Sequence, residues 1–160
     1  DAGADDAGTD AGADDAGADD AGADSAADSA SDASMMACVE ATITTEAVSS
    51  TTIDAEDNFD PVDGCVGGFA TGDDVVFAFT AGDAGTYRIT VMPSPEWNPM
   101  VYVLDDCSGE TCSDGTNFGS IGDPETLDIE LAAVETATIV VDTALTDIFG
   151  GAFTIEVAAR

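Results

Sequence analysis

The sequence predicts an all-β protein: an antiparallel β-sandwich of jelly-roll type, with about seven or eight strands and an N-terminal low-complexity extension. Val75, Phe77 and Phe79 share one parity of a run that lies between glycine turns. That period of two is typical of a strand with one face in a core. Several similar runs follow, separated by Gly, Asp and Pro turn signals, and no amphipathic helix of useful length interrupts them.

The expected strands can be placed in order along the chain. Modest alternation predicts one or two short strands at 41–45 and 48–53, followed by a loop at 54–68 that is dense in Asp and Gly. Stronger runs predict the strands 74–80, 85–92, 100–104, 127–131, 136–141 and 152–157. Short strands at this spacing favour a sandwich.

Composition divides the chain into two parts. Residues 1–34 contain only Asp, Ala, Gly, Ser and one Thr, and Asp-Ala-Gly recurs at a mostly five-residue period. Such a segment cannot build a core, so we expect an extended, disordered spacer. The alternative is an ordered assembly arm in which cations or neighbouring subunits neutralise the aspartates. Residues 35–160 carry every Cys, Met, Pro and aromatic residue and are long enough for one domain.

The net charge of −32 restricts the partners. Arg88 and Arg160 are the only cations, against 34 acids, and there is no Lys or His. Nucleic acids and anionic membranes are excluded as partners because both require a basic surface. Such self-repulsion requires strong screening or bound cations. Adaptation to a salty medium and structural divalent cations are both open interpretations.

Four cysteines predict two disulfides and an oxidising compartment, so we expect an extracellular or cell-surface protein. The four residues between Cys107 and Cys112 suggest a local bridge, which would leave Cys38 to pair with Cys65. A zinc site is the alternative, but the paired C-x-x-C spacing is missing. The chain begins at Asp1 and not at Met, which suggests a mature or trimmed secreted protein. No apolar run approaches the length of a membrane span, so membrane insertion is not expected.

Several motifs occur in an order that resembles a known family. They are Cys38, Ala41-Thr42-Ile43, Asp57-Asn58-Phe59, Cys65-Val66-Gly67-Gly68, the run from Gly72 to Phe79, the run from Gly85 to Val91, the run from Tyr102 to Cys107, the run from Ala137 to Asp142 and the run from Gly151 to Val157. Together they look like a bacterial pre-peptidase C-terminal (PPC) domain over residues 38–160. Ala137 departs from the pattern, because it stands where that family has an aromatic residue.

This resemblance implies a β-sandwich of the kind attached to secreted enzymes and surface proteins. Such domains are non-catalytic, are linked to substrate binding or secretion, and sometimes bind calcium. Residues 1–34 lie outside the resemblance and look like the Asp/Ala/Gly-rich spacers of secreted bacterial surface proteins.

The acidic loop supplies the candidate metal ligands, which we expect to be Asp54, Asp57, Asp60 and Asp63. Calcium prefers several oxygen ligands on a flexible loop, and this loop offers them densely. The acids do not have the register of an EF-hand. Acids at strand ends could complete the site, namely Asp73, Asp74, Asp105, Asp106 and Asp142. The alternative is a solvated, salt-adapted surface without a bound ion.

The aromatic residues suggest one contact site. Trp97 lies in a loop between prolines, so it is the candidate for a ligand or subunit contact, whereas Tyr87 and Tyr102 fit strand patterns and are expected to pack. The absence of His and Lys removes the common general bases and nucleophile activators, so we do not expect an enzyme.

These inferences favour a non-enzymatic extracellular structural or interaction protein. It would be a self-assembling surface or filament subunit, a homo-oligomer stabilised by cations, with an extended segment that adds to a neighbour's sheet edge. The alternative is a calcium-dependent accessory module that binds a polysaccharide or peptide at the cell surface.

Overall fold

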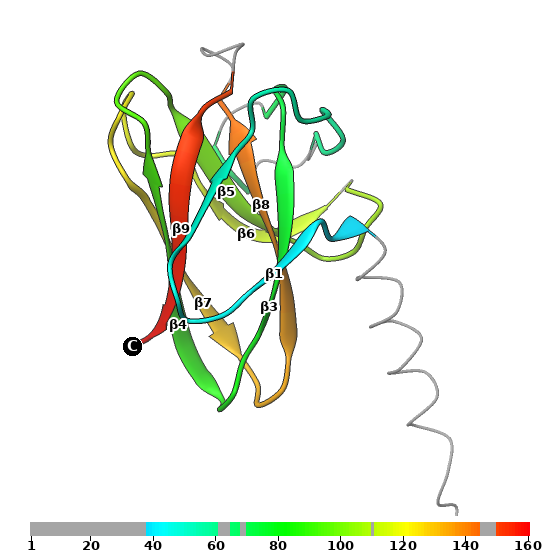
Figure 1. Cartoon of the computed structure of the whole chain (residues 1–160). Helices are drawn as coiled ribbons and strands as arrows, with labels where there is room; N and C mark the ends of the chain where they lie inside the picture. Colours follow the sequence, from blue (N-terminus) through cyan, green and yellow to red (C-terminus); the bar gives the residue numbers. More distant parts are fainter. Residues whose placement is uncertain (1–37, 61–64, 68–69, 110, 145–149) are drawn as a thin grey trace, which may run out of the picture.

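The computed structural model describes residues 38–60, 65–67, 70–109, 111–144 and 150–160, and these form a sandwich of two β-sheets (Figure 1). The strands are β1 (Ala41–Ile43), β2 (Val48–Thr51), β3 (Val75–Thr80), β4 (Gly85–Pro93), β5 (Pro99–Leu104), β6 (Cys112–Thr116), β7 (Glu125–Leu131), β8 (Thr136–Thr143) and β9 (Ala152–Ala159). The all-β sandwich predicted from the sequence is thereby confirmed.

The strands divide into a five-stranded sheet of order β1-β3-β8-β5-β6 and a four-stranded sheet of order β2-β9-β4-β7. Every pairing is antiparallel except that of β1 with β3, which is parallel and joins Ala41 to Phe77 and Ile43 to Phe79. The chain then crosses from β1 in one sheet to β2 at the edge of the other.

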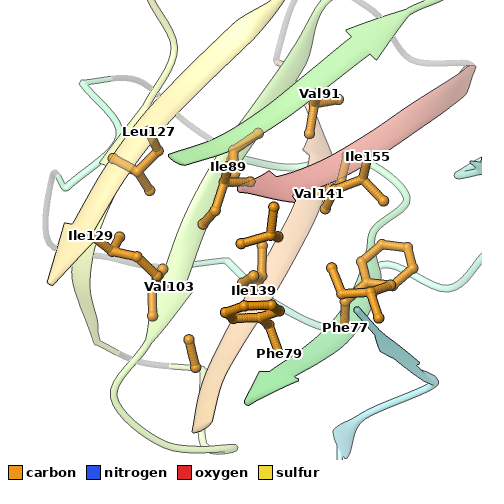
Figure 2. Close-up of a cluster of buried hydrophobic side chains, with 14 of the residues drawn as sticks. Phe77, Phe79, Ile89, Val91, Val103, Leu127, Ile129, Ile139, Val141 and Ile155 are labelled. Atoms are coloured by element: carbon orange, nitrogen blue, oxygen red, sulfur yellow. The ribbon is translucent and has the colours of Figure 1, made fainter. Parts of the chain in front are cut away.

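The main core lies between the sheets and is built by the period-two alternation of their strands. In β7 every second residue is buried, from Glu125 to Leu131, and β9 alternates in the same way. Figure 2 shows side chains such as Ile89 of β4 and Ile139 of β8, both 0% exposed, projecting into the space between the two sheets. Burial of this apolar surface is the main stabilising contribution.

A second apolar cluster covers the outer face of the five-stranded sheet. Met100 and Tyr102 of β5 and Val140 of β8 project outward there and pack against Phe59 and Val66 from the connection between β2 and β3. The inner strands of this sheet are therefore buried on both faces, so β5 is almost continuously apolar and β8 is buried at every position after Thr136.

Both disulfides join this outer layer to the β5–β6 hairpin. Cys38 pairs with Cys107 and Cys65 pairs with Cys112. All four cysteines are bonded, as expected, but the expected pairing of Cys107 with Cys112 and of Cys38 with Cys65 is wrong. Leu104 pairs with Cys112 across the hairpin, and Cys112 packs against the outer cluster together with Cys65 and Cys38. The partners therefore come from segments that are distant in sequence.

Two features of the sheets were not expected. Strand β6 has the sequence Cys-Ser-Asp-Gly-Thr, with no alternation of apolar residues, so it has no sequence signal of a strand. It forms because its backbone makes an antiparallel hydrogen-bond ladder with β5 at the edge of the sheet. The parallel pairing of β1 was also unforeseen, since only three residues take part. The predicted spacer or arm at 1–34 lies outside the described residues.

Candidate functional site

A buried carboxylate holds the acidic residues 56–60, here called the clasped segment, against the five-stranded sheet. Asp74, fully buried just before β3, accepts hydrogen bonds at Oδ2 from the backbone N–H of Asn58 (2.7 Å) and of Phe59 (2.9 Å). Its own N–H donates to the carbonyl of Glu56 (3.2 Å). Its second oxygen, Oδ1, is buried and has no hydrogen-bond partner in the described part of the chain. A buried carboxylate oxygen without a partner is costly, so this atom calls for a ligand or a proton.

A second buried acid lies under the same segment. The Tyr102 hydroxyl lies 2.9 Å from the carbonyl oxygen of Phe59 and 2.8 Å from Oδ2 of Asp142. A phenol carries one hydrogen, so it donates to one of these acceptors only. Both contacts are satisfied when Asp142 is protonated and donates to Tyr102, which in turn donates to Phe59.

The electrostatics of the two acids agree with this arrangement. Burial raises the pKa of Asp142 to about 8, although the hydrogen bonds that its ionised form accepts from Tyr102 and Thr143 oppose the rise. Burial also raises the pKa of Asp74 to about 6, and the charges of Asp57 and Glu40 add to the rise. The pKa of Tyr102 is raised above its usual range by burial and by the adjacent Asp142, so the phenol stays neutral.

The predicted metal ligands are only partly gathered. Burial, followed by the charges of Asp60 and Asp73, raises the pKa of Asp57, so these three acids are close enough to repel. Asp54 is exposed in the turn after β2, with a left-handed φ of 63°. Asp63 lies outside the described residues. Within the ranges that the structure describes, no group of three or more His, Cys, Asp or Glu is arranged to hold a metal ion as it stands.

The strand-end acids fall into two groups. Asp73, Asp74 and Asp142 lie close to residues 56–60, the segment that Asp74 holds. Asp105 and Asp106 instead begin the β5–β6 turn, where Asp105 N–H donates to the carbonyl of Thr111 and Asp106 accepts from the N–H of Ser108. Asp74 directly precedes the apolar strand β3, whereas Asp142 lies within β8, and nothing in the sequence indicated the hydrogen bonds between Asp74 and the backbone of Asn58 and Phe59.

A shallow hollow opens beside the clasped segment. Its volume is about 580 Å³, and it is lined by Cys38, Glu40, Glu56, Asn58, Phe59, Cys107 and Ser108. Glu40 and Glu56 give it a negative charge, so it suits a cation or a polar ligand better than an anion.

Trp97 does not provide the exposed contact that was predicted. It is 1% exposed, and its ring packs against Phe153 at a centroid distance of 5.7 Å. The indole N–H donates to the hydroxyl of Thr143 (3.3 Å), and the ring covers Gly151 so closely that a Cβ there would lie 2.3 Å from it. The prolines around Trp97 shape a loop that folds its indole inward. Tyr87 and Tyr102 are buried, as expected.

Both cations of the chain converge on one carboxylate of the open sheet face. Arg88 of β4 binds Asp128 of β7 through two hydrogen bonds, of 2.7 and 2.9 Å, and Arg160 also donates to Asp128. The bond from Arg88 lowers the pKa of Asp128, and the charge of Arg160 adds to this. The pair is exposed to solvent, so it contributes little to stability.

The comparisons with known proteins found similar folds and no close relatives. No family model matches, and no curated protein matches. Among solved structures, the pre-peptidase C-terminal domain of a collagenase from Bacillus anthracis is similar with a TM-score of 0.50 and 11% identity, over 75% of this chain and 96% of that one. CorA, a surface-associated copper-binding protein of Methylomicrobium album BG8, gives a TM-score of 0.47 and 8% identity over 77% and 99%.

A third solved structure, the GH26-CBM35 mannanase of Podospora anserina, gives a TM-score of 0.37 and 14% identity over 72% of this chain and 28% of that one. The collagenase domain carries the conclusion about fold: the chain has the fold of a pre-peptidase C-terminal domain, as its motifs predicted. The two disulfides fit an extracellular protein. In the part of the chain that the structure describes, no helix is long and apolar enough to cross a membrane.

Proposed function

We propose that this chain is a non-enzymatic extracellular interaction module whose acidic segment 54–60 binds a structural calcium ion. The observation that carries the proposal is the buried Oδ1 of Asp74, which has no hydrogen-bond partner at the base of that segment. Asp57, Asp60 and Asp73 bring further carboxylates to the same place. Together with the predicted ligands Asp54 and Asp63, they supply only oxygen donors, the chemistry that calcium prefers.

The ion would act on the outer layer rather than on the main core. Asp74 and Tyr102 already fix the backbone around Phe59, so a cation there would relieve the repulsion among the acids above them. Because the ligands are not assembled in the described residues, Asp57 and Asp60 would turn inward upon binding, and affinity would be modest. The calcium ion would thereby add to the hydrogen bonds and disulfides that already hold the outer layer on the five-stranded sheet.

Calcium titration of the intact chain, followed by thermal unfolding, tests this. A ligand present at about 100 times its Kd stabilises a protein by about 2.7 kcal/mol, so a measurable rise in Tm is expected, which a chelator reverses. Asp57→Asn and Asp60→Asn should each reduce the calcium-dependent rise. Glu156→Gln, an exposed acid on the opposite sheet face, is the matched control and should leave it unchanged. An equal rise in all four proteins would mean general screening and would contradict a site.

A second candidate function is self-assembly into a surface layer or filament. Strand β2 pairs with β9 only from Ala152 to Ile155, although β4 pairs with β9 as far as Ala159. In the described residues no strand continues beside Val157 and Ala159 on that side, and such an open edge can accept a strand from another chain. Sedimentation at several concentrations, with calcium and with chelator, tests this. Large species that dissociate in chelator would support it, and monomers in both conditions would contradict it.

A further inference from the structure

Exposed apolar side chains gather at one corner of the four-stranded sheet. Phe118 is 94% exposed and Ile121 is 58% exposed, both in the connection between β6 and β7, and Met92 near the end of β4 is 57% exposed. With Pro95 and Pro124, which are also exposed, these residues define what we call the apolar corner.

The packing of the connecting segments places these residues together. The N–H of Gly122 donates to the carbonyl of Trp97 (2.9 Å), and a Cβ on Gly122 would lie 2.7 Å from the carbonyl oxygen of Pro95. Val91 pairs with Glu125 across β4 and β7, so the next residues in that register, Met92 and Pro124, adjoin one another. These contacts bring the β6–β7 connection beside the β4–β5 connection and the end of β4, and Phe118 and Ile121 belong to that β6–β7 connection.

A buried carboxylate fixes the shape of the β6–β7 connection. Glu125 is 2% exposed and accepts hydrogen bonds from the hydroxyl of Thr116 (2.9 Å) and from the backbone N–H of Phe118 (3.3 Å) and Gly119. The N–H of Asp123 also donates to the carbonyl of Ser120 (2.8 Å). Phe118 is thus presented by an ordered backbone, which reduces the entropy that a partner must overcome on binding.

Acidic residues flank the corner, and they determine which partner fits. Glu96 and Asp123 are exposed in the adjoining segments, and both cations of the chain are bound to Asp128. An apolar centre with a polar rim is the usual anatomy of a protein interface. The negative rim repels a second copy of this chain, whose net charge is −32, and also repels an anionic membrane.

We propose that the apolar corner is the docking surface for a basic protein partner, which has an apolar socket for Phe118 and Ile121 and a rim of Lys or Arg. This rests on the proposed function as an interaction module and names the partner's chemistry. Phe118 would be the central anchor, since aromatic side chains in the middle of an interface dominate binding energy. The acidic rim would accelerate association and make it sensitive to salt.

The test uses a fluorescent peptide of alternating Lys and Leu as the probe, with a Lys-Ser peptide of the same length and charge as its control, at about 150 mM salt. Anisotropy titrations compare the intact chain with Phe118→Ser/Ile121→Ser, with Phe118→Ala, and with Val134→Ser. Val134 is 78% exposed at the opposite end of β7, which makes it a matched control for apolar exposure.

We expect the Lys-Leu peptide to bind the double variant at least about tenfold more weakly, the Phe118→Ala variant more weakly to a smaller extent, and Val134→Ser unchanged, because one buried aromatic anchor contributes that much. The Lys-Ser peptide should bind all four proteins equally weakly. Equal binding of both peptides, or unchanged binding by the double variant, would overturn the proposal. So would Phe118-dependent binding of a neutral oligosaccharide in place of the peptide, or a Phe118-dependent dimer in sedimentation.

The calcium-dependent rise in Tm, measured on the same variants, separates this proposal from the previous one. A retained rise with weakened peptide binding supports both proposals. A retained rise with unchanged peptide binding overturns the docking surface alone.

Discussion

The two sheets of the sandwich face different surroundings, although they share one core. The five-stranded sheet is covered on its outer side by a layer that contains Phe59 and is held by two disulfides and by the hydrogen bond from the N–H of Phe59 to Asp74. The four-stranded sheet presents its outer side to water, where residues such as Asp128 and Glu156 alternate with buried ones. The burial of the strands reflects this difference: β5 is buried at all six positions, whereas buried and exposed residues alternate along β7.

The comparison shows that the carboxylates with raised pKa values lie beneath the outer layer of the five-stranded sheet. A carboxylate on the open face, Asp128, has a lowered pKa because Arg88 binds it, while carboxylates beneath the layer, Asp74 and Asp142, have raised pKa values because they are buried. Acids of one chain therefore respond to pH in opposite directions according to the sheet face on which they lie.

The largest effect is expected from pH. The pKa of Asp142 in the folded chain, about 8, lies above its unfolded value, so its stabilising contribution is complete below about pH 4 and is lost as the pH rises through 8. The loss is on the order of 5 kcal/mol. Asp74 acts in the same direction, with its pKa at about 6. Denaturant unfolding in chelator between about pH 4 and pH 9 measures this.

The matched variant for the pH experiment is Asp142→Asn, whose amide can donate to Tyr102 without titrating. Its stability should fall much less between pH 4 and pH 8 than that of the parent. If the free energies of unfolding of the two proteins fall in parallel with pH, Asp142 is not the cause of the pH dependence. The opposite pKa shifts on the two sheet faces would then have no effect on stability.

The second effect comes from the bridge between Cys38 and Cys107. Its loop spans 69 residues, and the chain-entropy model gives about 4 kcal/mol for such a closure. Replacing both cysteines by Ala should lower the free energy of unfolding by that amount, measured by guanidinium titration. The calcium-dependent rise in Tm should also shrink, because the bridge holds the outer layer. A loss below about 1 kcal/mol would show that the layer is held without it.

The third effect compares two methionines on the outer faces of the two sheets. Met100 is fully buried under the layer, so Met100→Ala should cost about 2–4 kcal/mol through lost contacts and a cavity. Met92 is 57% exposed on the open face, so Met92→Ala should stay within about 0.5 kcal/mol. Urea unfolding of both variants measures the contrast, and similar costs would mean that the outer layer does not exclude water.

The smallest effect compares two glycines with left-handed backbones. Gly109 has a φ of 71°, and a Cβ there would lie 2.3 Å from Cδ1 of Phe59, so Gly109→Ala combines strain with displacement of the ring. Gly67, with a φ of 65°, has nothing within 4 Å. We expect about 1 kcal/mol for Gly67→Ala and about 2–3 kcal/mol for Gly109→Ala. Equal Tm values for the two variants would place Phe59 away from Gly109.

The sequence predicted the sheets well wherever a strand borders apolar surface. The runs around Val75 and Ile155 were recognisable because alternation or continuous apolarity reflects burial. Strand β6 was missed because its residues are mostly polar and its ladder depends on β5, which lies earlier in the chain. The cysteine pairing was missed for a related reason, since local spacing does not reveal which distant segments cover a sheet face.

The candidate site was predictable in composition and not in arrangement. The dense acids at 54–63 marked the region, and the repulsion between Asp57 and Asp60 shows that part of the predicted set is close together. Trp97, predicted as a ligand or subunit contact, is buried instead because a loop residue beside prolines can still turn toward the core. Phe118 gave no signal in the sequence, since its exposure depends on the hydrogen bonds that Glu125 makes with the backbone.

The convergence of both arginines on Asp128 has a consequence for survival in a protease-rich medium. Enzymes of the trypsin type cleave after Arg or Lys, and the only such bond between Asp1 and Arg160 follows Arg88. Arg88 lies within β4, between β7 and β9, and its guanidinium is held by Asp128. Cleavage there requires the four-stranded sheet to open, so digestion by such an enzyme would report the opening of that sheet.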